Sequence, residues 1–367
     1  MITDVMIIGG GLSGLRAATE LDARGIDYLV LEARDRFGGR ILSKSGVGKD
    51  NLYDLGPAWL WPGQPRMIKL IADLGLQVFE QHANGRVVFQ DRDGSVRRDL
   101  SFTTMKGSLR VAGGMAQVVD GMADRLAHSR LLKGHAVTNL IRSSAGIEAI
   151  AYHHGVETSI KARCAVLAIP PRVAVETIKF DPDPGTAARG AMKGVPTWMA
   201  GQAKLIAIYD RPFWREAGLS GDGISHKGPL FEIHDASPVS GDESALFGFV
   251  GRPAIHRRGN SSSLVEASIA QLTTMFGEQA NSPIDVISHD WATEAYTARD
   301  ADADISATHP GYGMPGALAR LWDGRLAFAS TEVARSFGGL MEGALEAAEQ
   351  AIKSLMLRDP HRLSSTA

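Results

Sequence analysis

The first forty residues alternate short apolar runs with a glycine-rich turn, in an order that predicts a small unit of secondary structure. Residues 4–8 form an apolar run that ends in the glycines of 9–14. Apolar residues then recur at helical spacing over 15–21. A second apolar run over 28–31 ends in Glu32. The pattern therefore predicts strand, glycine turn, helix and strand, closed by an acidic side chain.

This order is typical of a dinucleotide-binding βαβ unit, and each key residue has its own physical reason. Gly9 allows a sharp turn off the strand, Gly11 lets the backbone approach a pyrophosphate, and Gly14 lets the helix pack closely on the strand. The helix N-terminus offers free N–H groups and partial positive charge to the phosphates. Glu32 is placed to accept hydrogen bonds from a ribose diol. Flexible loops also collect glycines, but here the flanking strands, helix and acid are all present.

Farther along, the apolar spacing predicts a second lobe and a return to the first sheet. Residues 163–171 form an apolar run stopped by two prolines, which predicts a buried strand of the parallel sheet. A shift toward Pro, Gly and Asp from residue 180 onward marks the crossing into the second lobe. Helices are predicted over 65–76, 116–126, 262–277 and 340–349, and strands within 87–97, 131–160, 198–209, 229–235 and 245–251.

Composition narrows the class of protein. The 367 residues suffice for about two domains, and a net charge of −2 gives no global field that would recruit nucleic acid or an anionic membrane. No apolar run approaches membrane-spanning length, and the first strand begins too early for a signal peptide, which predicts a cytoplasmic protein. The single cysteine, Cys164, excludes an intramolecular disulfide and a multi-cysteine metal site and is expected in the core.

No metal site is expected. His153 and His154 are adjacent in a predicted hairpin strand, where their side chains would face opposite ways. None of the histidines has the H-E-x-x-H spacing of a zinc enzyme, and neither a G-x-S-x-G nor a Walker sequence is present.

The residues after Glu32 indicate which dinucleotide is bound. The stretch Glu32-Ala33-Arg34-Asp35-Arg36-Phe37-Gly38-Gly39-Arg40 resembles the extension typical of FAD enzymes in the amine oxidase and protoporphyrinogen oxidase superfamily, which includes the flavin-containing monoamine oxidase family. This resemblance implies FAD. In that family the glycines pass close to the cofactor, and the arginine lies near its pyrophosphate and ribityl chain. Taken alone, Arg40 is only a good anion partner beside a permissive turn.

Further segments resemble the family in the same order along nearly the whole chain. Asp54 and Gly56 resemble the strand that crosses beneath the flavin, and Val137 stands where a valine meets the adenine through its backbone. Glycines before the predicted C-terminal helix would direct its N-terminus at the pyrimidine edge of the flavin. The resemblance implies a set of FAD-binding residues, namely Gly9, Gly11, Leu12, Ser13, Gly14, Glu32, Ala33, Arg34, Gly39, Arg40, Gly56, Pro57, Ala58, Trp59, Val137, Trp291 beside the flavin ring, Glu332 at the ribityl chain, Gly339, Leu340 and Met341.

A single lysine interrupts the apolar strand predicted within 198–209. Because lysine is rarely buried without purpose, Lys204 stands out, although an edge-strand lysine that extends to water is an alternative. The residues that follow it resemble the family's aromatic-Pro-Phe-Trp-Arg sequence at 209–215. In that family the lysine holds a water against flavin N5, near the place where oxygen reacts. The resemblance therefore implies a catalytic, electrostatic role for Lys204.

Aromatic and apolar residues are the candidates for an amine pocket. Trp59 and Trp61 alternate as strand residues do and share a face, where they form either protein core or a wall of the pocket. Phe249 belongs to a strand of the predicted substrate sheet. His234 on a neighbouring strand is either a substrate contact or a structural histidine. Leu340 completes the candidate substrate pocket.

The chain departs from the family pattern at three places, and two of them change what is expected of the FAD linkage and of the substrate. Asp300 stands where some relatives carry a cysteine bonded to the flavin, so the FAD is expected to be non-covalent. Ala301 and Leu340 stand where animal monoamine oxidases carry the two tyrosines of an aromatic cage, which disfavours a neurotransmitter-like arylalkylamine as substrate. Ser330 stands where glycine is usual.

Together these observations predict an α/β flavoprotein with a split Rossmann-type FAD-binding domain and a mixed-sheet, α+β substrate domain. The predicted boundaries are 1–60, 111–175 and 285–357 for the FAD-binding domain, 61–110 and 176–284 for the substrate domain, and 358–367 for a polar tail. The expected partners are a small-molecule amine and dioxygen, and the sequence is compatible with a homodimer. The expected reaction converts the amine to an imine, which water hydrolyses, and reduces dioxygen to hydrogen peroxide.

Three alternatives remain open. The first is a flavin dehydrogenase or desaturase of the same superfamily that acts on a non-amine substrate and avoids oxygen. The second is a flavin-binding protein without enzymatic activity. A nicotinamide enzyme is the third, and Gly38-Gly39-Arg40 argues against it.

Overall fold

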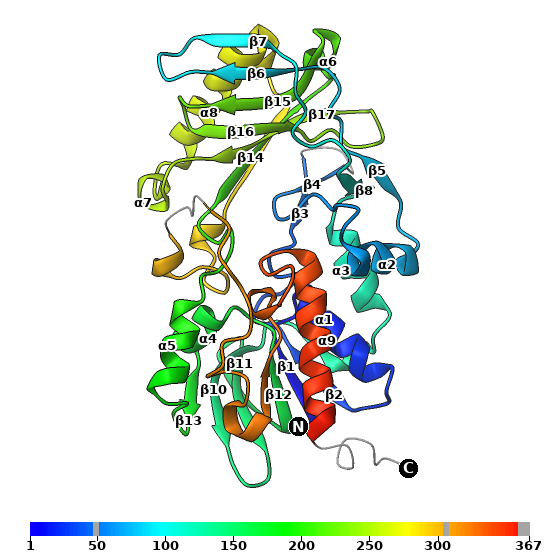
Figure 1. Ribbon diagram of the computed structural model, residues 1–367, viewed down its shortest axis with the longest axis vertical. Coiled ribbons are helices and arrows are strands. Elements are labelled where there is room, and N and C mark those ends of the chain that lie inside the picture. The colour runs from blue at the N-terminus through cyan, green and yellow to red at the C-terminus, as the bar shows by residue number, and fades with distance from the viewer. Residues whose placement is uncertain (47–50, 304–307, 359–367) are drawn as a thin grey trace.

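A computed structural model of the chain describes residues 1–46, 51–303 and 308–358. Two large sheets dominate it, one toward each end of the long axis of the molecule (Figure 1). The first contains the N-terminal strand, and the second is built mainly from the middle of the chain. The predicted α/β architecture with two sheet-based lobes is therefore confirmed.

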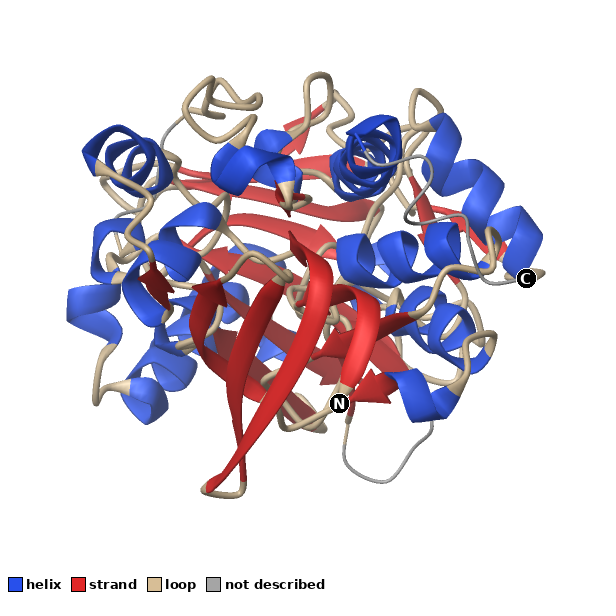
Figure 2. Ribbon diagram, turned by 90° about the horizontal axis from the view of Figure 1, so that it is seen from below, coloured by secondary structure: helices blue, strands red, loops and turns tan. Residues whose placement is uncertain are grey.

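The first sheet is built on parallel pairing around its N-terminal strand. β1 (Ile2–Ile8) lies between β12 (Val156–Leu167) and β2 (Tyr28–Leu31). Further strands give the order β13-β10-β11-β12-β1-β2-β9, with β19 paired to β12. Figure 2 shows this sheet next to the N-terminus, with helices on either side of it. Their bounds are β9 (Leu131–Leu132), β10 (Ala136–Arg142), β11 (Ile147–His153), β13 (Lys179–Asp181) and β19 (Leu326–Phe328). The predicted opening unit and the return of the chain at 163–171 are both confirmed.

Helices cover both faces of the first sheet because alternate strand residues point to opposite sides. Val5 and Ile7 pack with α1 (Leu12–Asp22) and α9 (Met341–Arg358), whereas Met6 and Ile8 belong to the core on the other side. The first layer also holds α2 (Pro65–Leu74) and α3 (Ala116–Asp124), and the other holds α4 (Pro171–Thr177) and α5 (Thr186–Gly194). Cys164 is buried in the first of these cores, as expected.

The second sheet has the strand order β18-β14-β17-β16-β15-β6-β7 and is antiparallel except where β15 meets β6. The bounds are β6 (Arg86–Gln90), β7 (Val96–Leu100), β14 (Ala203–Tyr209), β15 (Leu219–Ser225), β16 (Leu230–Asp235), β17 (Ser244–Val250) and β18 (Asp285–Asp290). Leu205 and Leu246 pack on α8 (Ser261–Phe276). Ile206 belongs to the separate core on the opposite face, and Lys204 shares that face because it is two residues away.

Short strand pairs and short helices complete the fold. The strand pairs are β3 (Ser43–Ser45) with β4 (Leu52–Asp54) and β5 (Val78–Glu80) with β8 (Leu109–Val111). The short helices are α6 (Phe213–Glu216), α7 (Ala254–Arg257) and the 3-10 helices η1 (His128–Arg130), η2 (Glu278–Asn281), η3 (Trp291–Thr293), η4 (Asp300–Asp302), η5 (Leu321–Gly324) and η6 (Thr331–Val333). No helix in the described ranges is both long and apolar enough to cross a bilayer.

Strand pairing departs from the predicted domain boundaries in two segments. β18, at 285–290, pairs with β14 of the second sheet, although the boundaries assign it to the FAD-binding domain. β13, at 179–181, pairs with β10 of the first sheet, although the boundaries assign it to the substrate domain. A period-two pattern identifies a strand but not its partner, which explains both differences. The other boundaries stay a prediction.

His153 and His154 also differ from the expectation. Their ring centroids lie 4.2 Å apart instead of facing opposite ways. The reason is that His154 has a φ of 48°, which breaks the alternation of an extended strand. Within the described ranges these histidines are still not part of any three-residue group that is able to hold a metal ion.

We expect Gly14→Ala to destabilise the protein by about 1–3 kcal/mol, the usual cost of overpacking. A Cβ at this helical position would overlap the carbonyl oxygen of Gly9. Denaturant titration of the ligand-free protein measures the free energy of unfolding. Gly190→Ala is the matched control, because Gly190 lies in α5 and its ideal Cβ would have no atom within 4 Å. The control should be neutral or slightly stabilising, and equal stability of the two variants would contradict the close packing of α1 on β1.

Candidate functional site

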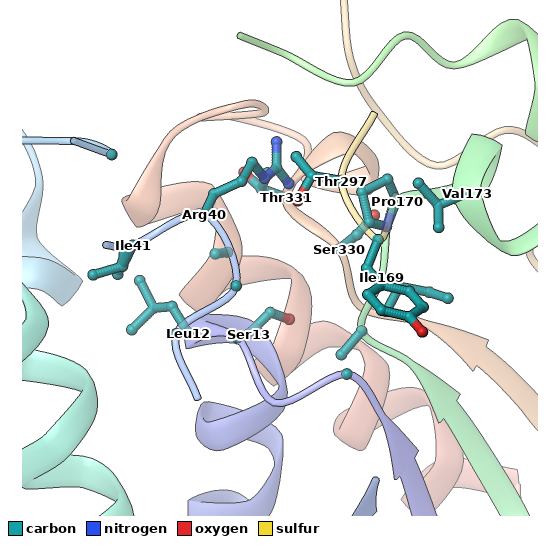
Figure 3. A pocket seen from close by; sticks show the side chains of 18 of the residues that line it. Leu12, Ser13, Arg40, Ile41, Ile169, Pro170, Val173, Thr297, Ser330 and Thr331 are labelled. Atoms are coloured by element: carbon teal, nitrogen blue, oxygen red, sulfur yellow. The ribbon is translucent and has the colours of Figure 1, made fainter. Parts of the chain in front are cut away.

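A cavity of about 440 Å³ extends from the glycine turn after β1 to β14 of the second sheet. Figure 3 shows part of its wall, with Leu12, Ser13 and Arg40 on one side and Ile169 and Pro170 on the other. Most of the predicted site residues line it, namely Gly9, Gly11, Leu12, Ser13, Glu32, Ala33, Arg34, Gly39, Arg40, Gly56, Pro57, Ala58, Trp59, Trp61, Val137, Lys204, Phe249, Trp291, Gly339, Leu340 and Met341. Gly14, Glu332 and His234 do not line it.

The end of the cavity beside β1 combines free backbone donors with an acidic side chain. Gly9 has a φ of 104°, which glycine adopts without steric cost, and it turns the chain off the strand. α1 begins at Leu12 with no side-chain cap, so its first N–H groups are available to a ligand. The buried Glu32 carboxylate accepts hydrogen bonds from the backbone N–H groups of Gly10 (2.7 Å) and Arg34 (2.8 Å). These bonds orient the carboxylate, and its remaining lone pairs are available to a ligand hydroxyl.

Several lining residues at this end had no signal in the sequence. The Arg34 guanidinium donates to Glu294 Oε2 (2.8 Å) and Thr297 Oγ1 (2.8 Å) and lies 5.5 Å from the ring centroid of Tyr296. Thr297 and Tyr296 line the cavity on an irregular segment after β18. Arg34 and Glu294 are 260 positions apart, and no local pattern reveals such a pair.

The middle of the site holds buried polar atoms without a protein partner. Arg40 donates to Glu332 Oε1 (2.6 Å) and to the carbonyl oxygen of Trp198 (3.3 Å). Glu332 Oε2 and Ser330 Oγ are buried and have no hydrogen-bond partner among the described residues. Buried polar atoms are almost always hydrogen-bonded. Ser330 lines the cavity, so a polar ligand there would supply the missing partner of its hydroxyl group. An ideal Cβ on Gly11 would be in ordinary van der Waals contact with the carbonyl oxygen of Gly38, 3.7 Å away. Gly11 itself lines the cavity, where the pyrophosphate of the expected FAD would lie.

The far end of the cavity is organised around Lys204. β14 lies between β17 and β18, and Lys204 is 5% exposed, so the edge-strand alternative is wrong. Its Nζ donates to the carbonyl oxygen of Gly56. Three aromatic rings surround the same atom, with centroids 4.8 Å (Phe247), 5.1 Å (Phe249) and 5.8 Å (Trp59) away. The ammonium group therefore meets one carbonyl and several ring faces in place of bulk water.

The environment of Lys204 also changes its protonation. Burial disfavours the charged form and lowers the pKa of Lys204 to about 8, and the carboxylate of Asp54 limits this fall. A lysine with this pKa still carries its charge at neutral pH. Its charge is poorly solvated, so it interacts strongly with any negative charge that forms nearby.

Aromatic and apolar side chains also line the cavity. Trp59 is half-buried and Trp61 is 38% exposed, and both line the cavity although their segment forms no strand. Phe249 and Leu340 also line it. Four further lining residues were not predicted from the sequence, namely Gln64, Trp198, Met199 and Gln202.

The N-terminus of α9 meets the cavity as well. Gly339, with a φ of 82°, precedes Leu340 and Met341, and all three line the cavity. The Thr331 hydroxyl donates to the carbonyl oxygen of Leu340 (2.7 Å) and fixes this turn. Because a helix N-terminus carries partial positive charge, this end of α9 favours a ligand with negative charge.

Three residues singled out by the sequence lie away from the cavity. The prediction that His234 lines the substrate pocket is wrong, because Asp222 and Glu232 hold its ring within the second sheet. Ala301 belongs to η4, where its carbonyl oxygen accepts a hydrogen bond from Arg172. Asp300 precedes it and is exposed.

Comparisons with known proteins agree with this geometry. A family model described as flavin containing amine oxidoreductase matches residues 12–102 and 92–352. The Mycobacterium tuberculosis protein AofH, a flavin-containing monoamine oxidase by assigned name only, is 26% identical, with 95% of this chain and 95% of AofH aligned. An L-amino acid dehydrogenase of Synechocystis is 23% identical, with 96% of this chain and 94% of that protein aligned.

A solved structure shows the same fold. Putrescine oxidase bound to putrescine superposes with a TM-score of 0.82, covering 98% of this chain and 100% of that chain at 22% sequence identity. The family model, by contrast, rests on the sequence and spans most of the chain. The protein therefore belongs to the family of flavin-containing amine oxidoreductases, whose cofactor is FAD.

Proposed function

We propose that this flavin-dependent amine oxidoreductase is an oxidase, which passes electrons from an amine to dioxygen and releases hydrogen peroxide. Family membership supports the coarser statement that it is a flavoenzyme acting on amines. The observation that carries the finer proposal is Lys204, a buried ammonium group among aromatic rings in the cofactor cavity. Dioxygen acquires negative charge as it takes up electrons, and a fixed cation in a dry site stabilises that charge.

Groups along the cavity would hold FAD. The N-terminus of α1 would bind the pyrophosphate, Glu32 the ribose, and Arg40, which Glu332 holds in place, the ribityl chain. When bound, FAD supplies the acceptor for the hydride that leaves the α-carbon of the amine. Cys164, the single cysteine, lies in the core of the first sheet, which supports non-covalent binding.

The aromatic end of the cavity would enclose the amine. Trp59, Trp61 and Phe249 give it apolar walls, and apolar surroundings favour the neutral amine over the ammonium ion. Only the neutral amine has the free electron pair that assists loss of the hydride. The product is an iminium ion, and water hydrolyses it to a carbonyl compound and ammonia or a smaller amine. The walls therefore select the protonation state of the substrate.

A flavin dehydrogenase is the second candidate function. It is supported by the L-amino acid dehydrogenase of Synechocystis among the relatives. Lys204 favours the oxidase, because a dehydrogenase has no need of a cation that stabilises reduced oxygen. A location in the cytoplasm and a homodimer stay predictions.

One anaerobic experiment separates the two functions. We expect one member of a panel of amines to bleach the flavin absorbance of the purified holoenzyme. Admission of air should then restore the absorbance and release one equivalent of hydrogen peroxide per flavin. Bleaching that only an artificial electron acceptor reverses would contradict the oxidase and support the dehydrogenase.

Lys204→Met should slow reoxidation of the reduced flavin by dioxygen by about 10²-fold, the usual effect of removing one preorganised electrostatic group. FAD content and the rate of flavin reduction by the amine should change much less. Stopped-flow absorbance after mixing reduced enzyme with oxygenated buffer measures the effect. Lys161→Met, at an exposed lysine of β12, is the matched control. Equal reoxidation rates in the two variants would refute the role of Lys204.

The rate of reoxidation should fall as the pH rises. Lys204 is charged below its pKa of about 8 and neutral above it, so the stabilising cation is present at low pH and lost at high pH. Negative charge on the bound cofactor would move the midpoint to higher pH without changing the direction. Lys204→Arg should abolish the fall, because an arginine stays charged throughout this range. A reoxidation rate that increases with pH in the native enzyme would contradict the assignment.

A further inference from the structure

His234 is held between two carboxylates although it lies outside the cavity. Its Nδ1 is 2.8 Å from Asp222 Oδ1, and its Nε2 is 2.8 Å from Glu232 Oε1. Ionised carboxylates only accept hydrogen bonds, so both ring nitrogens donate and the ring is an imidazolium in a fixed orientation. Burial disfavours this charge, but the hydrogen bonds to Asp222 and Glu232 outweigh that cost and raise the pKa of His234 above its ordinary value.

Hydrogen bonds among the neighbouring groups hold the His234 ring in a fixed position. Asp222 is 1% exposed, accepts a hydrogen bond from Thr104 Oγ1 (2.8 Å), and donates its backbone N–H to Ser220 Oγ (3.1 Å). Glu232 closes the other side, with its side chain 40% exposed. The orientation of the imidazolium is therefore set from two neighbouring strands, β15 and β16.

The His234 ring packs against Trp59, which lines the cavity. Their ring centroids are 5.2 Å apart and their planes meet at 78°, an attractive edge-to-face arrangement. His234 also stacks on Phe247, at 5.7 Å and 24°. Trp59 Nε1 donates to Gln81 Oε1 (2.8 Å). Because residues 57–59 belong to no strand or helix, these side-chain contacts orient the indole in place of a backbone ladder.

We propose that His234 is a positioning residue that holds Trp59 as a preformed wall of the substrate pocket and thereby sets the affinity for the amine. This inference rests on the proposed function, because it requires that Trp59 meets the amine. A wall that is fixed before the substrate arrives loses less conformational freedom on binding, so the effect falls on affinity and not on the chemical step. His234→Asn should weaken amine binding about threefold to tenfold, the range expected for one aromatic pair.

A double-mutant cycle tests whether His234 acts on amine binding through Trp59. The variants are Trp59→Leu, His234→Asn and their combination, each with FAD bound. Anaerobic stopped-flow reduction at increasing amine concentration separates the dissociation constant from the limiting rate constant. If His234 acts through Trp59, His234→Asn raises the dissociation constant in the native background but not in the Trp59→Leu background. An equal rise in both backgrounds would overturn the proposal.

His226→Asn is the matched control. His226 packs edge-on against Phe89, at 5.2 Å and 83°, next to the same sheet, but Phe89 does not line the cavity. The dissociation constant of the amine should therefore stay at its native value in this variant. A rise as large as that of His234→Asn would show a general effect of the sheet and would also overturn the proposal.

A milder variant keeps the test decisive if His234→Asn does not fold. Glu232→Gln removes one carboxylate from the exposed side and leaves the ring in place, so it should raise the dissociation constant by a smaller factor. An unchanged constant in this variant would overturn the proposal. A native flavin that no amine reduces would overturn the proposed function together with this inference. Normal reduction by an amine, with native dissociation constants in the variants, would overturn the inference alone.

Discussion

Three successive residues, Asp54, Leu55 and Gly56, join the two sheets at the cavity. The buried Asp54 carboxylate accepts hydrogen bonds from a hydroxyl group on β3 and from a backbone N–H at the start of α3. The Leu55 carbonyl accepts from Trp291 Nε1 (2.9 Å) in η3, directly after β18, and the Gly56 carbonyl accepts from Lys204 on β14 of the second sheet. Backbone atoms thus fix the position of Lys204 relative to the rest of the cavity. The position of Lys204 is therefore insensitive to side-chain changes elsewhere.

This constraint explains how the fold tolerates a buried ammonium group. Removing a charge from water costs several kcal/mol unless other dipoles replace the solvent. Here the Gly56 carbonyl and the faces of Phe247 and Phe249 replace part of it, and the carboxylate of Asp54 adds long-range attraction. The replacement is incomplete, which is why the pKa of Lys204 falls to about 8. A cation in this state is stabilised further when negative charge forms beside it, and that is the property an oxygen-reducing site needs.

Local patterns account for what the sequence predicts well. The glycine turn, helix and acid at Glu32 lie within forty consecutive residues, and the charge of Lys204 interrupts an otherwise apolar strand, so both signals are visible along the chain. Pairing between strands is not visible in this way. Nothing near His234 shows that Asp222 would lie beside it, and Tyr296 and Thr297 reach the cavity from an irregular segment without any period. The residues that the sequence missed or misplaced are those whose position depends on tertiary neighbours.

Backbone contacts hold some parts of the site and side-chain contacts hold others, and this difference bears on substrate specificity. Relatives between 22% and 26% identical to this chain carry names as different as monoamine oxidase, putrescine oxidase and amino acid dehydrogenase, yet the putrescine oxidase fold superposes over nearly the whole chain. The position of Lys204 in the cavity depends on a contact with the backbone. The orientation of Trp59, by contrast, depends on the side chains of His234 and Gln81 behind it. On the proposal that Trp59 meets the amine, changes behind this wall would alter the shape of the pocket without disturbing the cofactor groups. Substrate choice would then diverge at residues that never touch the substrate.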